Sequence, residues 1–102
     1  MPYKNAISVL RSEAERVSKI VPSSKWYLFG SVTKGVRLPS DIDVLVVCNN
    51  ESELLKVRKG LEKVCLKFPI DLLLMTVLDE QESNFIHAQN CQDLLTSNSN
   101  NA

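Results

Sequence analysis

Residues 40–47 read Ser-Asp-Ile-Asp-Val-Leu-Val-Val, a pattern that predicts a buried β-strand with two carboxylates at its start. Side chains alternate between the two faces of a strand, so Asp41 and Asp43 point to the same side. Two like charges on one face repel each other, and aspartate has a low strand propensity. The strand's own stability therefore does not explain this pair, and a divalent cation is the simplest partner that would make it favourable.

An anion-binding turn is predicted upstream of this strand. Residues 26–30, Trp-Tyr-Leu-Phe-Gly, form an apolar run that is followed by Ser31, a residue suited to begin a helix. Glycine lets the backbone approach a ligand closely, and the free N–H groups at a helix start attract phosphate. Lys34 and Arg37 lie in the loop that follows, where they can meet a triphosphate as charge partners. We therefore expect Gly30 and Ser31 to face the two aspartates.

A third carboxylate, Asp71, lies one residue into the apolar run of residues 70–76. A lone ionised carboxylate in such a strand is unfavourable unless it is paired or bound to a cation. If the Gly30 turn meets Asp43, the first two strands run antiparallel. A helix between the second and third strands is long enough for a right-handed parallel crossover, which puts Asp71 at the same end of the sheet. We therefore predict that Asp41, Asp43 and Asp71 form an open set of oxygen ligands suited to Mg²⁺.

Hydrophobic spacing predicts the remaining elements. We expect strands over 25–29, 42–48 and 70–76, long helices over 5–20, 51–67 and 79–89 (its start at 79 or 80), and a short helix over 31–36. Gly60 is a weak point inside the second long helix. This order predicts an α/β (α+β) fold, in which a small mixed β-sheet of three or more strands is flanked by helices.

Length and composition predict a single globular domain. With 102 residues, 44% of them hydrophobic and 24% charged, the chain suits one modest core, which we expect over residues 1–96, followed by a disordered polar tail over 97–102. No apolar run approaches the ~20 residues needed to span a bilayer, and the N-terminus lacks a signal-peptide core, so we expect a cytoplasmic protein without a membrane partner. The three cysteines are widely spaced and are expected to be reduced thiols.

Charge argues against nonspecific binding to nucleic acid. Lys plus Arg and Asp plus Glu number 12 each, so nucleic acid stays open as a partner but is not supported by the net charge. The second long helix is locally basic, a pattern typical of a solvated face interleaved with glutamates. Its basic residues are Lys56, Arg58, Lys59, Lys63 and Lys67.

These motifs carry a resemblance to a known family. Phe-Gly-Ser-x-x-x-Gly over residues 29–35, Ser-Asp-Ile-Asp-Val-Leu-Val-Val over residues 40–47 and the later Asp71 resemble the signature of the DNA polymerase beta-type nucleotidyltransferase superfamily. More narrowly they are similar to the minimal nucleotidyltransferase family, small proteins often paired with a HEPN partner in toxin–antitoxin systems. The resemblance covers residues 26–75 and implies that the single domain has a polymerase beta-like nucleotidyltransferase fold.

The resemblance also implies a chemistry. It is the transfer of a nucleoside monophosphate, with AMP from ATP as the first choice over other NTPs, to a hydroxyl on a protein or RNA, with Mg²⁺ or alternatively Mn²⁺ as cofactor. It assigns Gly30 and Ser31 to the triphosphate, Asp41 and Asp43 to both metals, and Asp71 to the metal that activates the acceptor hydroxyl. One departure is Lys34, which stands where related sequences commonly have an arginine. The lysine ammonium contacts phosphate as a point charge and lacks the bidentate geometry of a guanidinium group.

Two other functions stay open at this point. The first is a non-catalytic, antitoxin-like subunit that pairs with a HEPN-type partner through its helices or an exposed edge strand. The second is a dimer in which the aspartates bind a metal only for stability. A domain this small with an exposed sheet edge is suited to a homo- or hetero-oligomer.

Overall fold

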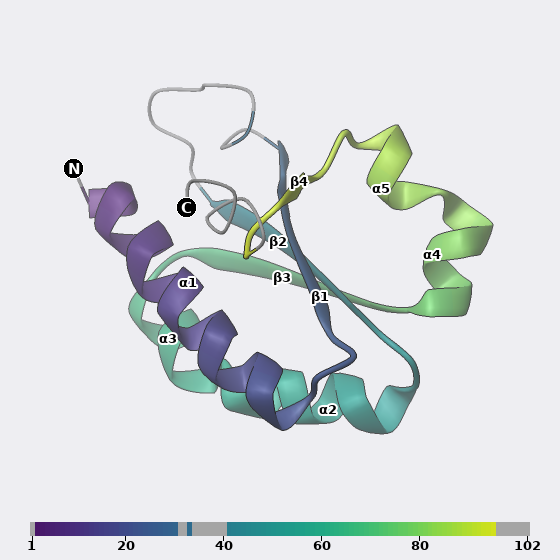
Figure 1. The fold of residues 1–102 in the computed structure, drawn as a ribbon. Helices are drawn as coiled ribbons and strands as arrows, with labels where there is room; N and C mark the ends of the chain where they lie inside the picture. The colour runs from purple at the N-terminus through teal and green to yellow at the C-terminus, as the bar shows by residue number, and fades with distance from the viewer. Residues whose placement is uncertain (1, 31–32, 34–40, 96–102) are drawn as a thin grey trace, which may run out of the picture.

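The computed structural model of the protein describes residues 2–30, 33 and 41–95, which form a four-stranded mixed sheet with helices on both faces (Figure 1). The strands are β1 (Lys25–Phe29), β2 (Ile42–Cys48), β3 (Ile70–Thr76) and β4 (Gln92–Asp93), in the spatial order β3-β2-β1-β4. The helices are α1 (Pro2–Ile20), α2 (Glu51–Gly60), α3 (Glu62–Lys67), α4 (Val77–Ser83) and α5 (Phe85–Ala88). The predicted mixed sheet with flanking helices is confirmed.

The three predicted strands and their directions are also confirmed. β1 and β2 pair antiparallel, with Phe29 opposite Asp43, whereas β2 and β3 pair parallel, with Asp43 opposite Asp71. The crossover from β2 to β3 runs through α2 and α3, as a parallel pair requires. The predicted short helix over 31–36 and the predicted tail over 97–102 lie outside the described residues.

Two predicted helices are each divided, which corrects the sequence-based expectation. The helix expected over 51–67 breaks at Leu61, directly after Gly60. The last helix begins earlier than expected because Thr76 and Asp79 form a capping box. It then breaks at Asn84, whose left-handed backbone (φ 53°) ends α4. The two-residue β4 was not predicted, since its pairing with β1 is a tertiary contact.

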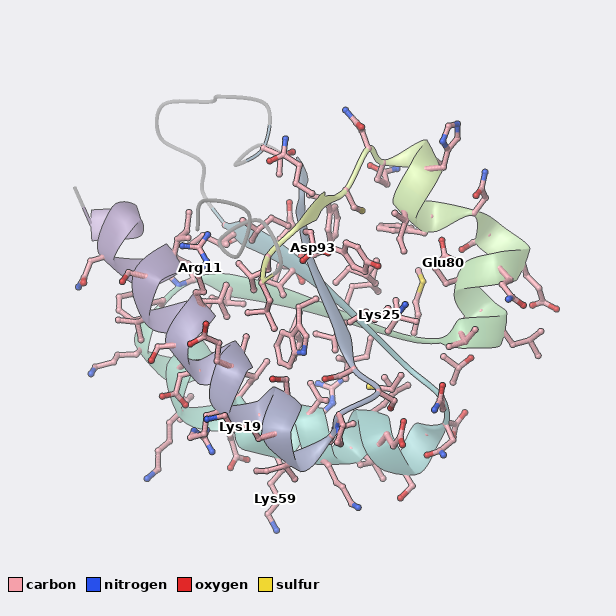
Figure 2. The ribbon with its side chains drawn as sticks, in the orientation of Figure 1. Arg11, Lys19, Lys25, Lys59, Glu80 and Asp93 are labelled. Carbon is pink, nitrogen blue, oxygen red and sulfur yellow. The ribbon has the colours of Figure 1, made fainter. Side chains whose placement is uncertain are left out.

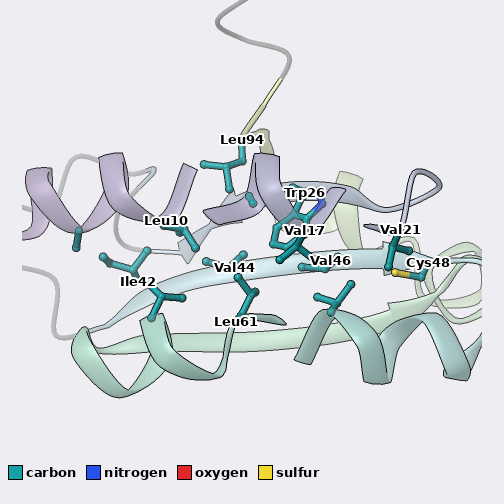
Figure 3. Close-up of a cluster of buried hydrophobic side chains, with 14 residues drawn as sticks. Leu10, Val17, Val21, Trp26, Ile42, Val44, Val46, Cys48, Leu61 and Leu94 are labelled. Atoms are coloured by element: carbon teal, nitrogen blue, oxygen red, sulfur yellow. The ribbon is translucent and has the colours of Figure 1, made fainter. Parts of the chain in front are cut away.

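The main core lies between one face of the sheet and helices α1 to α3 (Figure 3). Buried side chains of β2 alternate toward this face, and Trp26 is only 2% exposed, with its indole N–H donating to the Ser24 hydroxyl at 2.9 Å. The core comprises Ala6, Leu10, Ala14, Val17, Val21, Trp26, Ile42, Val44, Val46, Cys48, Val57, Leu61, Val64 and Leu94. All three cysteines are free thiols, and burial raises the pKa of Cys48 to about 11. In the described part of the chain, no helix has the length and apolar character that a membrane crossing requires.

The opposite face of the sheet carries Phe29, Asp43 and Asp71, because ladder partners share a face. Helices α4 and α5 lie on this side, where the rings of Phe29 and Phe85 meet edge to face with centroids 5.0 Å apart. The sheet therefore places its carboxylates away from the main core, at the end where β2 and β3 begin.

Gly60 lets α1 approach α2 closely. A Cβ at Gly60 would lie 2.8 Å from Cγ2 of Val17, a buried and β-branched side chain that has little freedom to move. The Arg16 guanidinium also donates to the Gly60 carbonyl oxygen at 2.8 Å. The glycine is therefore a packing requirement as well as a helix break.

We expect Gly60→Ala to lower the free energy of unfolding by about 1 kcal/mol, because overpacking of about 1–3 kcal/mol exceeds alanine's gain in helix propensity of about 1 kcal/mol. Urea denaturation measures the change. The control is the same substitution in a Val17→Ala background, where the overlapping methyl is gone and the loss should disappear. An equal loss in both backgrounds would show that contact with Val17 is not the cause.

Candidate functional site

The candidate site is built on the paired carboxylates Asp43 and Asp71. Each is the second residue of its strand, and the parallel register places them directly opposite each other. Asp43 is half-buried and Asp71 is exposed, and the charge of Asp71 acts on Asp43. Two carboxylates placed opposite each other repel unless they share a proton or bind a cation, so the pair is suited to either.

The electrostatics of Asp43 are unfavourable for its charged form. Burial, and then the charges of Asp71 and Asp41, raise the pKa of Asp43 above its ordinary value of 3.8. Among the described residues, no lysine or arginine forms an ion pair with any of these three aspartates. The site therefore concentrates negative charge, and no basic side chain among the described residues forms a salt bridge with it.

Gly30 lies directly against Asp43. Its φ of +75° is a backbone conformation that side chains rarely adopt, and a Cβ at this position would overlap Oδ2 of Asp43. Register explains the proximity, since Phe29 is the ladder partner of Asp43 and Gly30 follows at the end of β1. The structure thus brings the predicted anion-binding turn to the predicted carboxylate site.

Thr33 holds this turn from within. Both its backbone N–H (3.1 Å) and its hydroxyl (2.8 Å) donate to the Gly30 carbonyl oxygen. Thr33 was not among the predicted site residues, although a threonine hydroxyl close to a glycine at a strand end is a turn signal. Phe85 was not among them either, because its contact with Phe29 beside Asp43 is a tertiary contact without a local sequence signal.

The other predicted site residues are placed as follows. Asp41 is exposed, lies just before β2, and acts on Asp43 through its charge. The predictions for Ser31, Lys34 and Arg37 fall outside the described residues.

The described residues do not form a ready-made metal site with three or more side-chain ligands. Within residues 2–30, 33 and 41–95, no group of three or more His, Cys, Asp or Glu side chains is arranged so that it could hold a metal ion. The predicted three-carboxylate ligand set stays a prediction: Asp43 and Asp71 lie opposite each other, and Asp41 lies just before β2. These donors still fit a hard divalent cation, because Mg²⁺ commonly takes one or two carboxylates and completes its shell with waters and substrate phosphates.

Comparison with known proteins adds one match. A family model described as Polymerase beta, Nucleotidyltransferase matches residues 10–101, a range that includes Gly30, Asp41, Asp43 and Asp71. No curated protein and no solved structure matches the chain.

Proposed function

Because this chain belongs to the polymerase beta nucleotidyltransferase family, we propose that it transfers AMP from ATP to a hydroxyl acceptor and releases pyrophosphate. The family membership supports a nucleotidyltransferase type of activity, and it confirms the resemblance drawn from residues 26–75. The observation that carries the proposal is the contact between the Gly30 turn and Asp43, which is itself paired with Asp71. An anion-binding turn and a pair of carboxylates at one sheet end suit a metal-bound triphosphate.

Asp43 and Asp71 are the proposed metal ligands, with Asp41 as a third carboxylate beside them. Mg²⁺ is the proposed ion and Mn²⁺ the alternative. When bound, the ion neutralises triphosphate charge and polarises the acceptor hydroxyl. In the empty site the charges of Asp71 and Asp41 repel the charge of Asp43. A bound cation would attract all three carboxylates, so relief of this repulsion favours cation binding.

The Gly30 turn is the proposed triphosphate contact. Glycine leaves no side chain between the turn and Asp43, so a phosphate bound at the turn would lie close to the carboxylates that would hold the ion. The Thr33 bonds to the Gly30 carbonyl hold the turn's shape. Ser31, Lys34 and Arg37 are proposed as further phosphate contacts from their positions in the sequence.

The proposed reaction is an in-line displacement. The oxygen of the acceptor hydroxyl attacks the α-phosphorus of ATP and forms a new phosphoester bond. The bond between that phosphorus and the oxygen bridging to the β-phosphorus breaks, and pyrophosphate leaves with the electron pair. The hydroxyl proton passes to the Asp71 carboxylate, which is exposed and returns it to water. The chain contributes positioning and charge and forms no covalent intermediate.

Binding of a nonhydrolysable ATP analogue in the presence of Mg²⁺ tests this function. We expect calorimetry to detect binding by the wild type and none by Asp43→Asn, because the amide removes one proposed metal ligand without changing side-chain volume. The matched control is Glu82→Gln, which removes an exposed carboxylate from α4 and should bind like the wild type. Equal binding by wild type and Asp43→Asn would refute the proposed site.

A second candidate function, a non-catalytic subunit that pairs with a HEPN-type partner, is favoured by one observation. β3 lies at an edge of the sheet that the described residues form, and Leu55 (67% exposed) and Leu66 (85% exposed) line the grooves beside it. An edge strand with exposed leucines alongside is typical of a binding surface. If ATP labelled on the α-phosphate leaves no label on any macromolecule while the complex with the partner forms, this candidate replaces the first.

A further inference from the structure

β3 (Ile70–Thr76) is an open edge of the sheet. In the described part of the chain it pairs with β2 alone, so alternate residues direct their backbone N–H and C=O groups away from the sheet. Proteins commonly block such an edge with a proline, a bulge or a charged side chain. β3 contains no proline, and its single charged residue, Asp71, lies near its start. About 23 Å of regular strand is therefore open to a further strand.

Exposed apolar side chains gather along this edge. Four of the large hydrophobic residues exposed in the described part of the chain adjoin β3, namely Leu55, Leu66, Val77 and Leu78. Val77 and Leu78 directly follow the strand, whereas Leu55 and Leu66 line two grooves between β3 and the helices. The remaining one, Ile20, ends α1 and lines neither groove. Apolar exposure that is concentrated at one edge marks an interaction surface.

The two grooves lie at opposite ends of β3. The end groove has a volume of about 310 Å³ and is lined by Leu55 and Leu74 among others. The start groove has a volume of about 400 Å³ and is lined by Leu66 and Ile70 among others. Lys59 points away from the sheet (Figure 2), so the basic side of α2 is not part of either groove. Each groove thus combines a hollow with an exposed leucine.

The two ends of the edge also differ in charge. Glu51 and Asp79 line the end groove, and both are exposed. Among the described residues, the start groove has one carboxylate, Glu62, and Arg58 lines both grooves. Lys67 lies at the start end, where it is exposed and forms no ion pair within the described part of the chain. The end groove is therefore the more acidic, whereas the start of β3 offers a cation next to its exposed leucine.

We propose that β3 pairs antiparallel with β3 of a second copy of this chain, about a two-fold axis at Leu73. Such a contact sets each end of the edge against the opposite end of the other copy. The exposed Leu66 of each copy then faces the end groove of the other, beside its Leu55. Lys67, three residues before β3, is placed at the same end as Asp79 of the other copy, three residues after β3. The edge is complementary to itself in shape and charge, which favours a second copy as its partner.

The register about Leu73 also suits the side chains on both faces of the strand. Leu72 lies opposite Leu74 of the second copy, on the face that packs against the main core, since ladder partners share a face. Asp71 lies opposite Met75, which keeps the Asp71 side chains of the two copies about 14 Å apart along the strands. The carboxylates therefore do not oppose the pairing. This inference is independent of the proposed function, because it requires neither a nucleotide nor a metal.

Sedimentation equilibrium of the whole chain tests the pairing. At high concentration the wild type should reach twice its chain mass of 11.5 kDa. Leu66→Glu should raise the dimer Kd at least about 10-fold, because it removes an apolar contact and brings a negative charge to Glu51 and Asp79 of the other copy. The matched control is Ile20→Glu, which changes an exposed apolar residue outside the grooves and should dimerise like the wild type. Both positions are exposed, so both variants should keep the wild-type circular dichroism.

A charge exchange tests the antiparallel orientation. Lys67→Glu and Glu51→Lys should each raise the dimer Kd about 10-fold, because the two-fold axis repeats each contact. The double variant Lys67→Glu/Glu51→Lys should return to within about threefold of the wild type. Glu51 is the better choice for this exchange, since Asp79 takes part in the capping box of α4. Lys63→Glu is the control and should dimerise like the wild type, because Lys63 lines the crevice toward α1 and neither groove.

The outcomes distinguish a second copy from other occupants of the edge. A wild type that stays monomeric overturns the inference, and so does a dimer that Leu66→Glu and Ile20→Glu weaken equally. If the wild type alone is monomeric, and a HEPN-type partner binds it but not Leu66→Glu, the edge belongs to the second candidate function. Amide hydrogen exchange in residues 70–76 should slow as the dimer forms, and unchanged exchange in a dimer would exclude pairing through β3.

Discussion

Gly30→Ala is expected to abolish binding of the ATP analogue and to lower the free energy of unfolding by about 2–3 kcal/mol. Two physical effects act together. The backbone at Gly30 has φ +75°, which a residue with a Cβ adopts only with strain, and the added carbon would overlap Oδ2 of Asp43. The turn and the carboxylate must then move apart, which separates the proposed phosphate contact from the proposed metal ligand. Calorimetry measures the binding and urea denaturation the stability.

A double variant separates the two effects. In Gly30→Ala/Asp43→Ala the overlap is removed while the backbone strain stays, so the second substitution should recover part of the lost stability. Binding should stay absent, since a metal ligand is missing. If Gly30→Ala alone binds the analogue as the wild type does, the turn is not part of the site.

Asp43→Asn is expected to raise the melting temperature by about 2–4 °C at pH 7 in the presence of EDTA. Burial and the charges of Asp71 and Asp41 raise the pKa of Asp43 in the folded protein above 3.8. The native state therefore holds this proton more tightly than the unfolded chain, and wild-type stability falls as the pH rises from about 3.8 through the raised pKa. The amide carries no charge and avoids that loss. Thermal melts between pH 3 and 7 should show the difference shrinking toward zero at the acidic end.

Mg²⁺ should reverse this order of stability, so that the wild type melts at a higher temperature than Asp43→Asn. At a concentration ten times its Kd, a cation that binds only the folded wild type adds about 1.4 kcal/mol of stability, which is several degrees in melting temperature. Asp43→Asn should gain little, because it retains one carboxylate of the pair. Glu82→Gln serves as the control and should respond like the wild type. A variant that is less stable than the wild type in EDTA would contradict the assignment, since Asp43 would then stabilise the empty protein.

The sequence by itself determined the three long strands, their directions and the location of the carboxylates. Turn residues and helix-forming segments flank the apolar runs 42–48 and 70–76. The ends of these two strands could therefore be predicted from the neighbouring sequence alone. The Gly30 and Asp43 motifs predicted the antiparallel pairing of β1 and β2, and the length of the intervening helical segment predicted the parallel pairing of β2 and β3. Both arguments depend on short-range pattern and connection length, which the sequence contains.

Only the tertiary structure decided how these parts meet. It placed Asp43 directly opposite Asp71 and left Asp41 at the rim, it put Gly30 so close to Asp43 that no Cβ fits between them, and it brought Phe85 against Phe29. It also divided the helix after Gly60 at a contact with Val17, more than forty residues away in the sequence. Register and close packing depend on contacts between residues far apart in the chain, and hydrophobic periodicity carries no information about such distances.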